Sequence, residues 1–126
     1  MVNIIITGGS SSIGRELISK LSLKKVNIIY QINKSKPFIK KKNINFIRSD
    51  FCNHVSLKKF INFVTKKKNK IDFLIHLPSS KIQIKKFEDY SWFEINSQIN
   101  IQVRSLHFLL TSLIKKKMLS RKTKII

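Results

Sequence analysis

The stretch Thr7-Gly8-Gly9-Ser10-Ser11-Ser12-Ile13-Gly14 decides which fold to expect, because it joins an apolar run to a helical pattern. The run Val2–Ile6 is rich in β-branched residues and predicts a buried strand. After the glycines, one helical face carries apolar residues at the required spacing, namely Ile13, Leu17, Ile18 and Leu21. Strand, glycine turn and helix together predict a phosphate cradle, since glycine lets backbone N–H groups approach an anion and the helix N-terminus carries partial positive charge.

The rest of the chain alternates strand and helix patterns, with an irregular segment over residues 79–91. Further strands are expected at Val26–Ile32, Asn45–Ile47, Ile71–Leu77 and, beginning at the last residues, Lys124–Ile126. Helical spacing of apolar residues predicts helices over Val55–Lys68 and Ile95–Ile114. This alternation predicts an α/β, doubly wound parallel sheet of about five strands in the order 3-2-1-4-5, with ligand bound at the carboxyl ends of the strands.

Length and composition predict one globular domain over residues 1–126, with an unusual charge. Lys and Arg number 26 against 6 acidic residues, giving a net charge of +20. Such an excess fits a polyanion partner, but the sequence is rich in Lys, Ile and Asn throughout, as A/T-rich codons produce. The lysine triplets Lys40–Lys42, Lys66–Lys68 and Lys115–Lys117 stand near expected element ends rather than along one stripe. We therefore favour compositional bias over a selected basic surface, which makes a nucleic-acid partner the less favoured interpretation.

Cysteine and histidine usage limits the other function classes. Cys52 is the single cysteine, so an internal disulfide is excluded and a reducing compartment is expected. Cys52 and His54 are two residues apart, but His76 and His107 belong to other elements, so a metal site is not expected. No apolar stretch approaches the ~20 residues that span a bilayer. These features predict a cytoplasmic protein without a membrane partner.

The glycine turn has one competing interpretation, a nucleoside triphosphatase loop. Gly9 and Gly14 have the spacing of that loop, but Arg15 and Glu16 stand where Lys and a Ser or Thr are needed. A carboxylate in place of the Mg²⁺-binding hydroxyl argues against triphosphate chemistry. A dinucleotide turn fits better.

Three motifs in order resemble the short-chain dehydrogenase/reductase family. The family's turn reads Thr-Gly-x-x-x-Gly-Ile-Gly, and this chain matches it except for Ser12, which replaces the middle glycine. Asp72 and Leu74 match the family's Asp-x-Leu-Val-Asn-Asn-Ala-Gly segment, whose second half is replaced here by His76-Leu77-Pro78-Ser79. Ile99-Asn100-Ile101 resembles the family's Val-Asn-Leu segment on a long helix.

The resemblance implies a dinucleotide cofactor and assigns a role to each matching position. Residues 7–14, from Thr7 to Gly14, would hold the pyrophosphate. The second strand is followed by Asn33 and Lys34 and has no carboxylate at its end, which favours NADP, with NAD as the alternative. Asp50 would accept from the adenine amino group with Phe51 beside the ring; a helix N-cap or a turn aspartate is an equally good interpretation of Asp50. The resemblance also places His76, Leu77 and Pro78 beside the nicotinamide ribose and makes Asn100 the catalytic residue, which holds a water linked to the catalytic lysine.

The resemblance covers the first half of the family's domain, so the domain is expected to be incomplete at its C-terminus. The family's catalytic serine and its Tyr-x-x-x-Lys pair follow the fifth strand, beyond Ile126. Tyr30 and Lys34 have the spacing of that pair, but at a strand end, so we interpret the match as accidental. Whether the chain is an enzyme is therefore open.

Three hypotheses remain. The first is a truncated oxidoreductase whose relatives act on a carbonyl or alcohol, possible as a homo-oligomer at full length. The second is a dinucleotide-binding or degenerate module without catalysis. The third is a basic nucleic-acid-binding protein. We also expect Trp92 and Phe93 to lie in the core, and the apolar stripe Ile95–Ile114 to leave the isolated chain poorly soluble.

Overall fold

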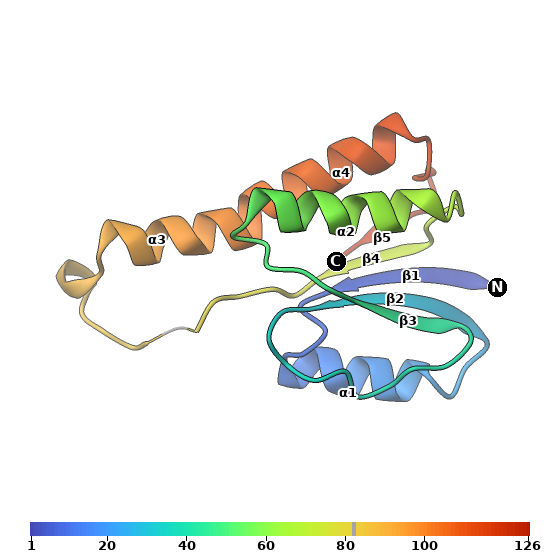
Figure 1. Ribbon diagram of the computed structural model, residues 1–126, viewed down its shortest axis with the longest axis horizontal. Coiled ribbons are helices and arrows are strands. Elements are labelled where there is room, and N and C mark those ends of the chain that lie inside the picture. Colours follow the sequence, from blue (N-terminus) through green and yellow to red (C-terminus); the bar gives the residue numbers. More distant parts are fainter. Residues whose placement is uncertain (82) are drawn as a thin grey trace.

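The computed structural model describes residues 1–81 and 83–126, which form a parallel five-stranded sheet with helices on both faces (Figure 1). The strand order is β3-β2-β1-β4-β5 and every pairing is parallel, so the predicted order is confirmed. The elements in chain order are β1 (Val2–Thr7), α1 (Ser12–Leu21), β2 (Val26–Ile32), β3 (Ile44–Arg48), α2 (His54–Lys66), β4 (Phe73–His76), the 3-10 turn η1 (Phe87–Asp89), α3 (Trp92–Gln98), the π-helical segment η2 (Ile99–Arg104), α4 (Ser105–Lys115) and β5 (Lys124–Ile125).

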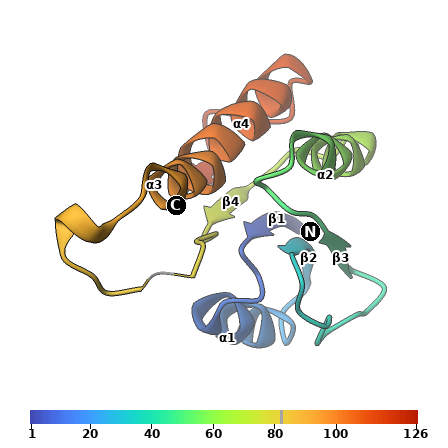
Figure 2. The ribbon, with the colours of Figure 1, turned by 60° about the vertical axis from the view of Figure 1, so that its left-hand side comes forward.

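Two apolar clusters fill the space on the two sides of the sheet. Because side chains alternate along a strand, Ile5 of β1 faces α2 and α4, whereas Ile4 and Ile6 face α1. The first cluster includes Phe60 of α2, and the second includes Ile18 of α1. Figure 2 shows α1 alone beneath the sheet and α2 beside α4 above it.

The longest helical stretch is interrupted by a π segment that the sequence did not predict. Residues 92–115 are helical throughout, but from Ile99 to Arg104 the bonding changes, so that the Ser105 N–H donates to the Asn100 carbonyl five residues back. A π segment inside an α-helix is uncommon and frequently marks a functional position. Asn100, the expected catalytic residue, lies within it.

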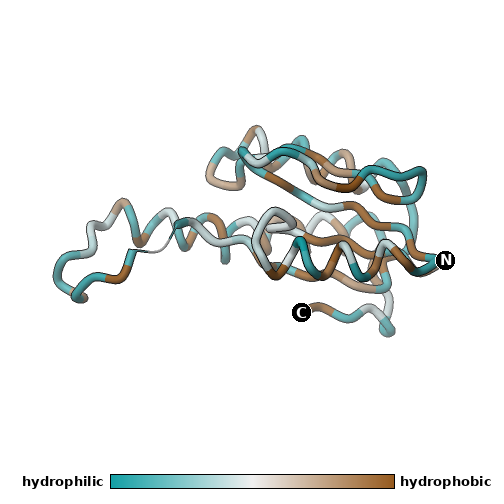
Figure 3. The backbone as a smooth tube through the Cα atoms, turned by 90° about the horizontal axis from the view of Figure 1, so that it is seen from below, coloured by the Kyte–Doolittle hydropathy of each residue, from teal (hydrophilic) through white to brown (hydrophobic). Residues whose placement is uncertain are grey.

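Helix α3 and the preceding loop extend beyond the sheet as an arm (Figures 1 and 3). Trp92 is 69% exposed and Phe93 is 79% exposed on this arm, so the expectation that they lie in the core was wrong. A large apolar side chain on a helix is buried only where another element covers it, which residue type does not reveal. The same holds for Ile13, which is 68% exposed although Ile18 on the same helix is fully buried.

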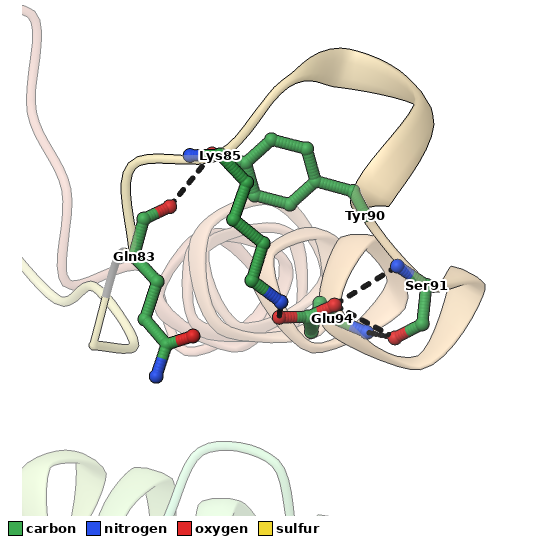
Figure 4. A network of polar contacts seen from close by, with 5 residues as sticks. All are labelled: Gln83, Lys85, Tyr90, Ser91 and Glu94. Carbon is green, nitrogen blue, oxygen red and sulfur yellow. Dashed lines mark hydrogen bonds and ion pairs between the residues drawn. The ribbon is translucent and has the colours of Figure 1, made fainter.

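A polar network fastens the loop of the arm onto α3 (Figure 4). The Lys85 Nζ lies 2.6 Å from Glu94 Oε1, and the Tyr90 hydroxyl donates to the Gln83 carbonyl at 2.7 Å. Ser91 and Glu94 form a capping box at the start of α3. The hydrogen bond from Lys85, with those from Ser91, lowers the pKa of the Glu94 carboxyl to about 2. Among the described residues, no helix has both the length and the apolar character needed to cross a membrane.

Candidate functional site

The turn between β1 and α1 requires glycine at two positions. Gly8 has a φ of +71°, and a Cβ added there would lie 2.5 Å from the Leu77 carbonyl carbon. A Cβ on Gly14 would lie 2.6 Å from the Gly8 carbonyl oxygen. Both distances are far below van der Waals contact, so the turn closes against the end of β4 and against itself because side chains are absent.

Gln31, near the end of β2, holds the first part of the turn from the side. Its Oε1 accepts the Gly8 N–H and its backbone carbonyl accepts the Gly9 N–H, each at 2.8 Å. Its Nε2 donates to the Ser49 carbonyl at 2.6 Å, so one buried side chain joins the turn to the end of β3. The sequence reasoning missed Gln31, although an amide within the apolar run Val26–Ile32 was a detectable signal.

Internal hydrogen bonds determine which N–H groups of the turn are left for an anion. Ser11 is the N-cap of α1: its Oγ accepts the Gly14 N–H at 3.0 Å and donates to the Gly8 carbonyl at 2.9 Å. The Ser11 N–H donates to the same carbonyl. Within the described part of the chain, the N–H groups that have no acceptor are those of Ser10, Ser12 and Ile13. The end of the turn and the start of α1 therefore offer three N–H groups to an anion, rather than the whole stretch 7–14.

A hollow of about 290 Å³ lies beside this turn, at the carboxyl ends of the central strands. Eight of the sequence-predicted site residues line it, namely Gly8, Ser10, Ser11, Asn33, Asp50, Phe51, Leu77 and Pro78. Gln31, Ser79, Ser80, Lys81 and Ile101 line it as well and were not predicted. The hollow spans the β2, β1 and β4 ends, where the strand order reverses, which is the expected place for a ligand in this fold.

The other predicted residues lie outside the lining of this hollow. Thr7 is fully buried in β1, and Gly9 packs beneath the Tyr30 ring, where an added Cβ would lie 2.9 Å from Cδ2. Ser12, Ile13 and Gly14 belong to the first turn of α1 rather than to the walls. Lys34, His76 and Asn100 do not line it either.

A second, open hollow of about 410 Å³ adjoins the first, and Asn33 and Asp50 line both. Its other lining residues are Lys34, Arg48, Ser49 and Ser56. Arg48 is the last residue of β3, and the sequence reasoning did not single it out. The two cations reach one hollow because β2 and β3 are neighbouring parallel strands, so their carboxyl ends lie side by side.

Asp50 is a turn aspartate, not the cap of α2. Its Oδ1 accepts the Cys52 N–H at 2.9 Å, while Asn53 is the N-cap of α2 and accepts the Ser56 N–H at 3.0 Å. The second carboxylate oxygen of Asp50 has no hydrogen bond within the described residues. Phe51 is 3% exposed and its ring packs 5.3 Å from the Phe60 ring, so this side chain belongs mainly to the core.

Arg104 connects the π segment to the loop that carries Asp50. Its Nη2 donates to the Cys52 carbonyl at 3.0 Å and approaches the Phe51 carbonyl at 3.4 Å. Its Nε is buried without a partner among the described residues. Arg104 thus ties η2 to the loop that follows β3, a role that one residue on a helix does not reveal from sequence.

His76 is bonded through both ring nitrogens and joins three elements. Nδ1 lies 2.7 Å from the Thr7 Oγ1, and Nε2 lies 3.0 Å from the Gln102 carbonyl oxygen. Because a carbonyl only accepts, Nε2 carries the hydrogen, and in the neutral ring Nδ1 accepts from the Thr7 hydroxyl. Burial lowers the pKa of His76, and the bond to the Gln102 carbonyl opposes that shift. The ring holds β1, β4 and η2 together, while its neighbours Leu77 and Pro78 line the hollow.

Asn100 lies next to the hollow, whereas Tyr30 is buried in the core. Asn100 lies in η2 directly before Ile101, which lines the hollow. Tyr30 is fully buried, and its hydroxyl donates to the Ile39 carbonyl at 2.6 Å. A buried, internally bonded hydroxyl is a core group, so the Tyr30 and Lys34 spacing is accidental, as the sequence indicated.

A family model described as short chain dehydrogenase matches residues 2–126. A comparison with curated protein sequences gave no match. Among solved structures, a short chain dehydrogenase family protein from Francisella tularensis has a TM-score of 0.83 at 21% identity, covering 99% of this chain and 49% of its own.

Two further solved structures have a bound dinucleotide in their descriptions. A short chain dehydrogenase from Leptospira borgpetersenii with bound NAD+ has a TM-score of 0.76 at 21% identity, covering 90% of this chain and 45% of its own. One from Burkholderia cenocepacia in complex with NADP has a TM-score of 0.72 at 16% identity, covering 90% and 50%. The chain therefore spans about half the length of these structures and shares their fold.

Proposed function

Because the chain belongs to the short-chain dehydrogenase family, we propose that residues 1–126 form the nicotinamide-dinucleotide-binding domain of an oxidoreductase acting on a carbonyl or alcohol. The observation that carries this proposal is the hollow at the reversal of strand order. Ser10 of the glycine turn and Asp50, one of whose carboxylate oxygens has no hydrogen bond among the described residues, line it, and the unpaired N–H groups of Ser12 and Ile13 lie next to it at the start of α1. When bound, such a cofactor supplies the hydride or accepts it.

The residues of the hollow fit the parts of a dinucleotide. The N–H groups of Ser10, Ser12 and Ile13 are donors at a helix N-terminus and suit the pyrophosphate. The second oxygen of Asp50 suits an amino group of the adenine. Leu77 and Pro78 supply the apolar wall at the end of β4, where the nicotinamide side is expected.

The second hollow supports NADP over NAD. Lys34 and Arg48 line it, and β2 ends without the carboxylate that would pair with a ribose 2′-hydroxyl. A 2′-phosphate between a lysine and an arginine would form charge-assisted hydrogen bonds. The carboxylate of Asp50 lines the same hollow, but one of its oxygens is already bonded to the Cys52 N–H.

The described residues support binding better than proton transfer. Tyr30, the tyrosine with a lysine four positions on, is buried. Asn100 is the one position that matches the family's catalytic set, and it lies in a π segment beside the hollow. A dinucleotide-binding module without catalysis is the second candidate function, because the residues that line the hollow are suited to hold a cofactor.

Binding is tested by titrating the full chain with NADPH and with NADH and following nucleotide fluorescence. We expect NADPH to bind more tightly, and the double variant Lys34→Ala/Arg48→Ala to lose about 10- to 100-fold in NADPH affinity with little change for NADH. Lys36→Ala, an exposed lysine outside both hollows, is the matched control. A folded chain that binds neither nucleotide at millimolar concentration would overturn the proposal.

Catalysis is tested separately with a panel of carbonyl substrates and NADPH. Binding with no turnover of any substrate supports the non-catalytic module. Turnover that Asn100→Ala abolishes, with NADPH affinity retained, supports the oxidoreductase.

A further inference from the structure

The lysine clusters, which look scattered along the sequence, gather at one end of the molecule. In a parallel sheet with crossover helices, every helix returns the chain to the amino ends of the strands. Three lysine clusters occupy these returns, namely Lys24–Lys25, Lys66–Lys68 and Lys115–Lys117, and a fourth, Lys40–Lys42, lies in the loop that enters β3. We call the surface that they form the amino edge; in Figure 1 it is the end at which the N-terminus lies and α1, α2 and α4 finish. The triplets stand near element ends, as the sequence indicated, and the fold brings those ends together.

Hydrogen bonds confirm that these returns are neighbours in space. Lys70 Nζ donates to the Lys117 carbonyl at 2.5 Å, and the Ile71 N–H donates to the Met118 carbonyl at 2.9 Å. On the other side of the sheet, Lys41 Nζ donates to the Ser22 carbonyl at 3.2 Å, which joins the end of α1 to the turn before β3.

The amino edge is recessed where the ends of α2 and α4 meet. A groove of about 870 Å³ is lined there by Lys59, Lys66, Lys68 and Lys116, and no carboxylate belongs to its described lining. A smaller hollow of about 170 Å³ adjoins it, since Met118 lines both. This hollow adds Lys42 and Lys67 together with five asparagines, at positions 3, 27, 43, 45 and 69.

The cations of this surface have no acidic partners among the described residues. The described residues form the ion pairs Lys20–Glu16 and Lys85–Glu94, and neither pair uses a lysine of the amino edge. Asp72 is an acidic residue at this edge, directly before β4. Its Oδ2 accepts the Asn3 N–H at 2.8 Å. Helix dipoles favour a cation at each C-terminus, but they do not account for Lys24–Lys25 or Lys40–Lys42, which lie beyond or between helices.

We propose that the amino edge binds the sugar–phosphate backbone of a nucleic acid, at the opposite end of the sheet from the dinucleotide hollow. Lysines neutralise phosphates, and asparagine amides hydrogen-bond to phosphates and sugars, which are the contacts that fix a protein on a nucleic-acid backbone. The amides of Asn3, Asn27 and Asn43 already donate within the chain, so Asn45 and Asn69 are the asparagines best placed for such contacts. Binding of this kind is independent of base sequence. A recessed groove suits a polymer strand better than the flat surface of a lipid bilayer.

The test compares two triple variants that lower the net charge equally. Lys42→Gln/Lys66→Gln/Lys116→Gln removes cations of the amino edge, and Lys36→Gln/Lys58→Gln/Lys86→Gln removes exposed cations elsewhere. Binding of the full chain to labelled RNA and DNA of arbitrary sequence, roughly 20 nucleotides long, is followed by fluorescence anisotropy at several salt concentrations. Because each lost phosphate contact lowers the slope of log K against log salt by about 0.7–0.9, we expect the amino-edge triple to lower it by about 2–3 and the control triple to leave it unchanged.

Three outcomes would overturn the proposal. The first is an equal loss in both triples, which would mean that net charge alone acts. The second is no binding to either polymer at about 100 mM salt. The third is displacement by vesicles of phosphatidylcholine with about 30% phosphatidylserine, again dependent on the amino-edge lysines, which would assign the surface to a membrane. NADPH affinity should be the same in both triples, so this test does not depend on the dinucleotide site.

Discussion

The loops at the two ends of the parallel strands differ in composition and in bonding. We call the loops at the carboxyl ends of the strands the carboxyl edge, by analogy with the amino edge. At the carboxyl edge, the loops are rich in glycine and serine, and most of their polar groups bond to one another, as the Gly8, Ser11 and Gln31 contacts show. At the amino edge, the loops are rich in lysine, and the charges have no acidic partners in the described residues. At the carboxyl edge, close packing leaves only a few N–H groups unpaired. At the amino edge, the lysine ammonium groups are not held in place by ion pairs among the described residues.

The largest expected effect is at Gly8, where the close packing of the carboxyl edge requires a residue without a side chain. Gly8→Val places a Cβ 2.5 Å from the Leu77 carbonyl carbon at a φ of +71°, so the turn and the end of β4 must separate. We expect a loss of about 3 kcal/mol or more in the free energy of unfolding, together with loss of dinucleotide binding. Urea denaturation followed by circular dichroism measures it. A variant as stable as the parent would show that this turn is not closely packed.

A smaller loss is expected at Gln31, which supplies the internal hydrogen bonding of the carboxyl edge. Gln31→Leu keeps the size of the side chain but leaves the Gly8 N–H and the Ser49 carbonyl without their partner. Two buried groups left unpaired predict a loss of about 2–3 kcal/mol. The control is Gln83→Leu on the exposed loop of the arm, where the backbone carbonyl makes the hydrogen bond and the side chain makes none in the described residues. Equal losses in the two variants would contradict the role of Gln31.

At the amino edge, a substitution that involves glycine is expected to raise the free energy of unfolding rather than lower it. Lys117 follows the end of α4 with a φ of +53°, a left-handed conformation that glycine adopts without strain. Lys117→Gly should therefore stabilise the chain by about 0.5–1 kcal/mol, since relief of strain exceeds the added chain entropy. Lys115→Gly, inside the last turn of α4, is the control and should destabilise. Thermal melting of both variants at one salt concentration decides the sign.

The smallest effect is the pH dependence contributed by His76. Its folded pKa is lowered by burial, so the folded chain binds fewer protons here than the unfolded chain does. The stability linked to the neutral ring is present above the ordinary histidine pKa of about 6.5 and decreases as the pH falls below it. His76→Gln should flatten the unfolding free energy between about pH 7 and pH 5 relative to the parent. A parent profile that rises on acidification in this range would contradict the assignment.

Much of the fold was predictable because it depends on local patterns. The buried run Val2–Ile6, the glycine turn and the helical face through Ile18 predicted the first βα unit, and alternation predicted the strand order. The lining residues Asn33, Asp50, Leu77 and Pro78 were predictable for a related reason, since each follows the end of a strand and parallel strands end at one edge. Exposure was not predictable in the same way: Trp92 and Phe93 are large aromatic residues, but no element covers them on the described arm.

The sequence by itself determined the order of elements, the position of the turn and the excess of positive charge, because each follows from neighbours along the chain. The tertiary structure decided which groups remain available. Gln31 occupies two N–H groups of the turn from 23 residues away, and Arg104 holds the loop of Asp50 from a distant helix. Long-range packing also brings Lys70 against Lys117, so that lysine clusters far apart in the sequence form one surface. Contacts of this kind depend on how strands align and helices return, which no local spacing encodes.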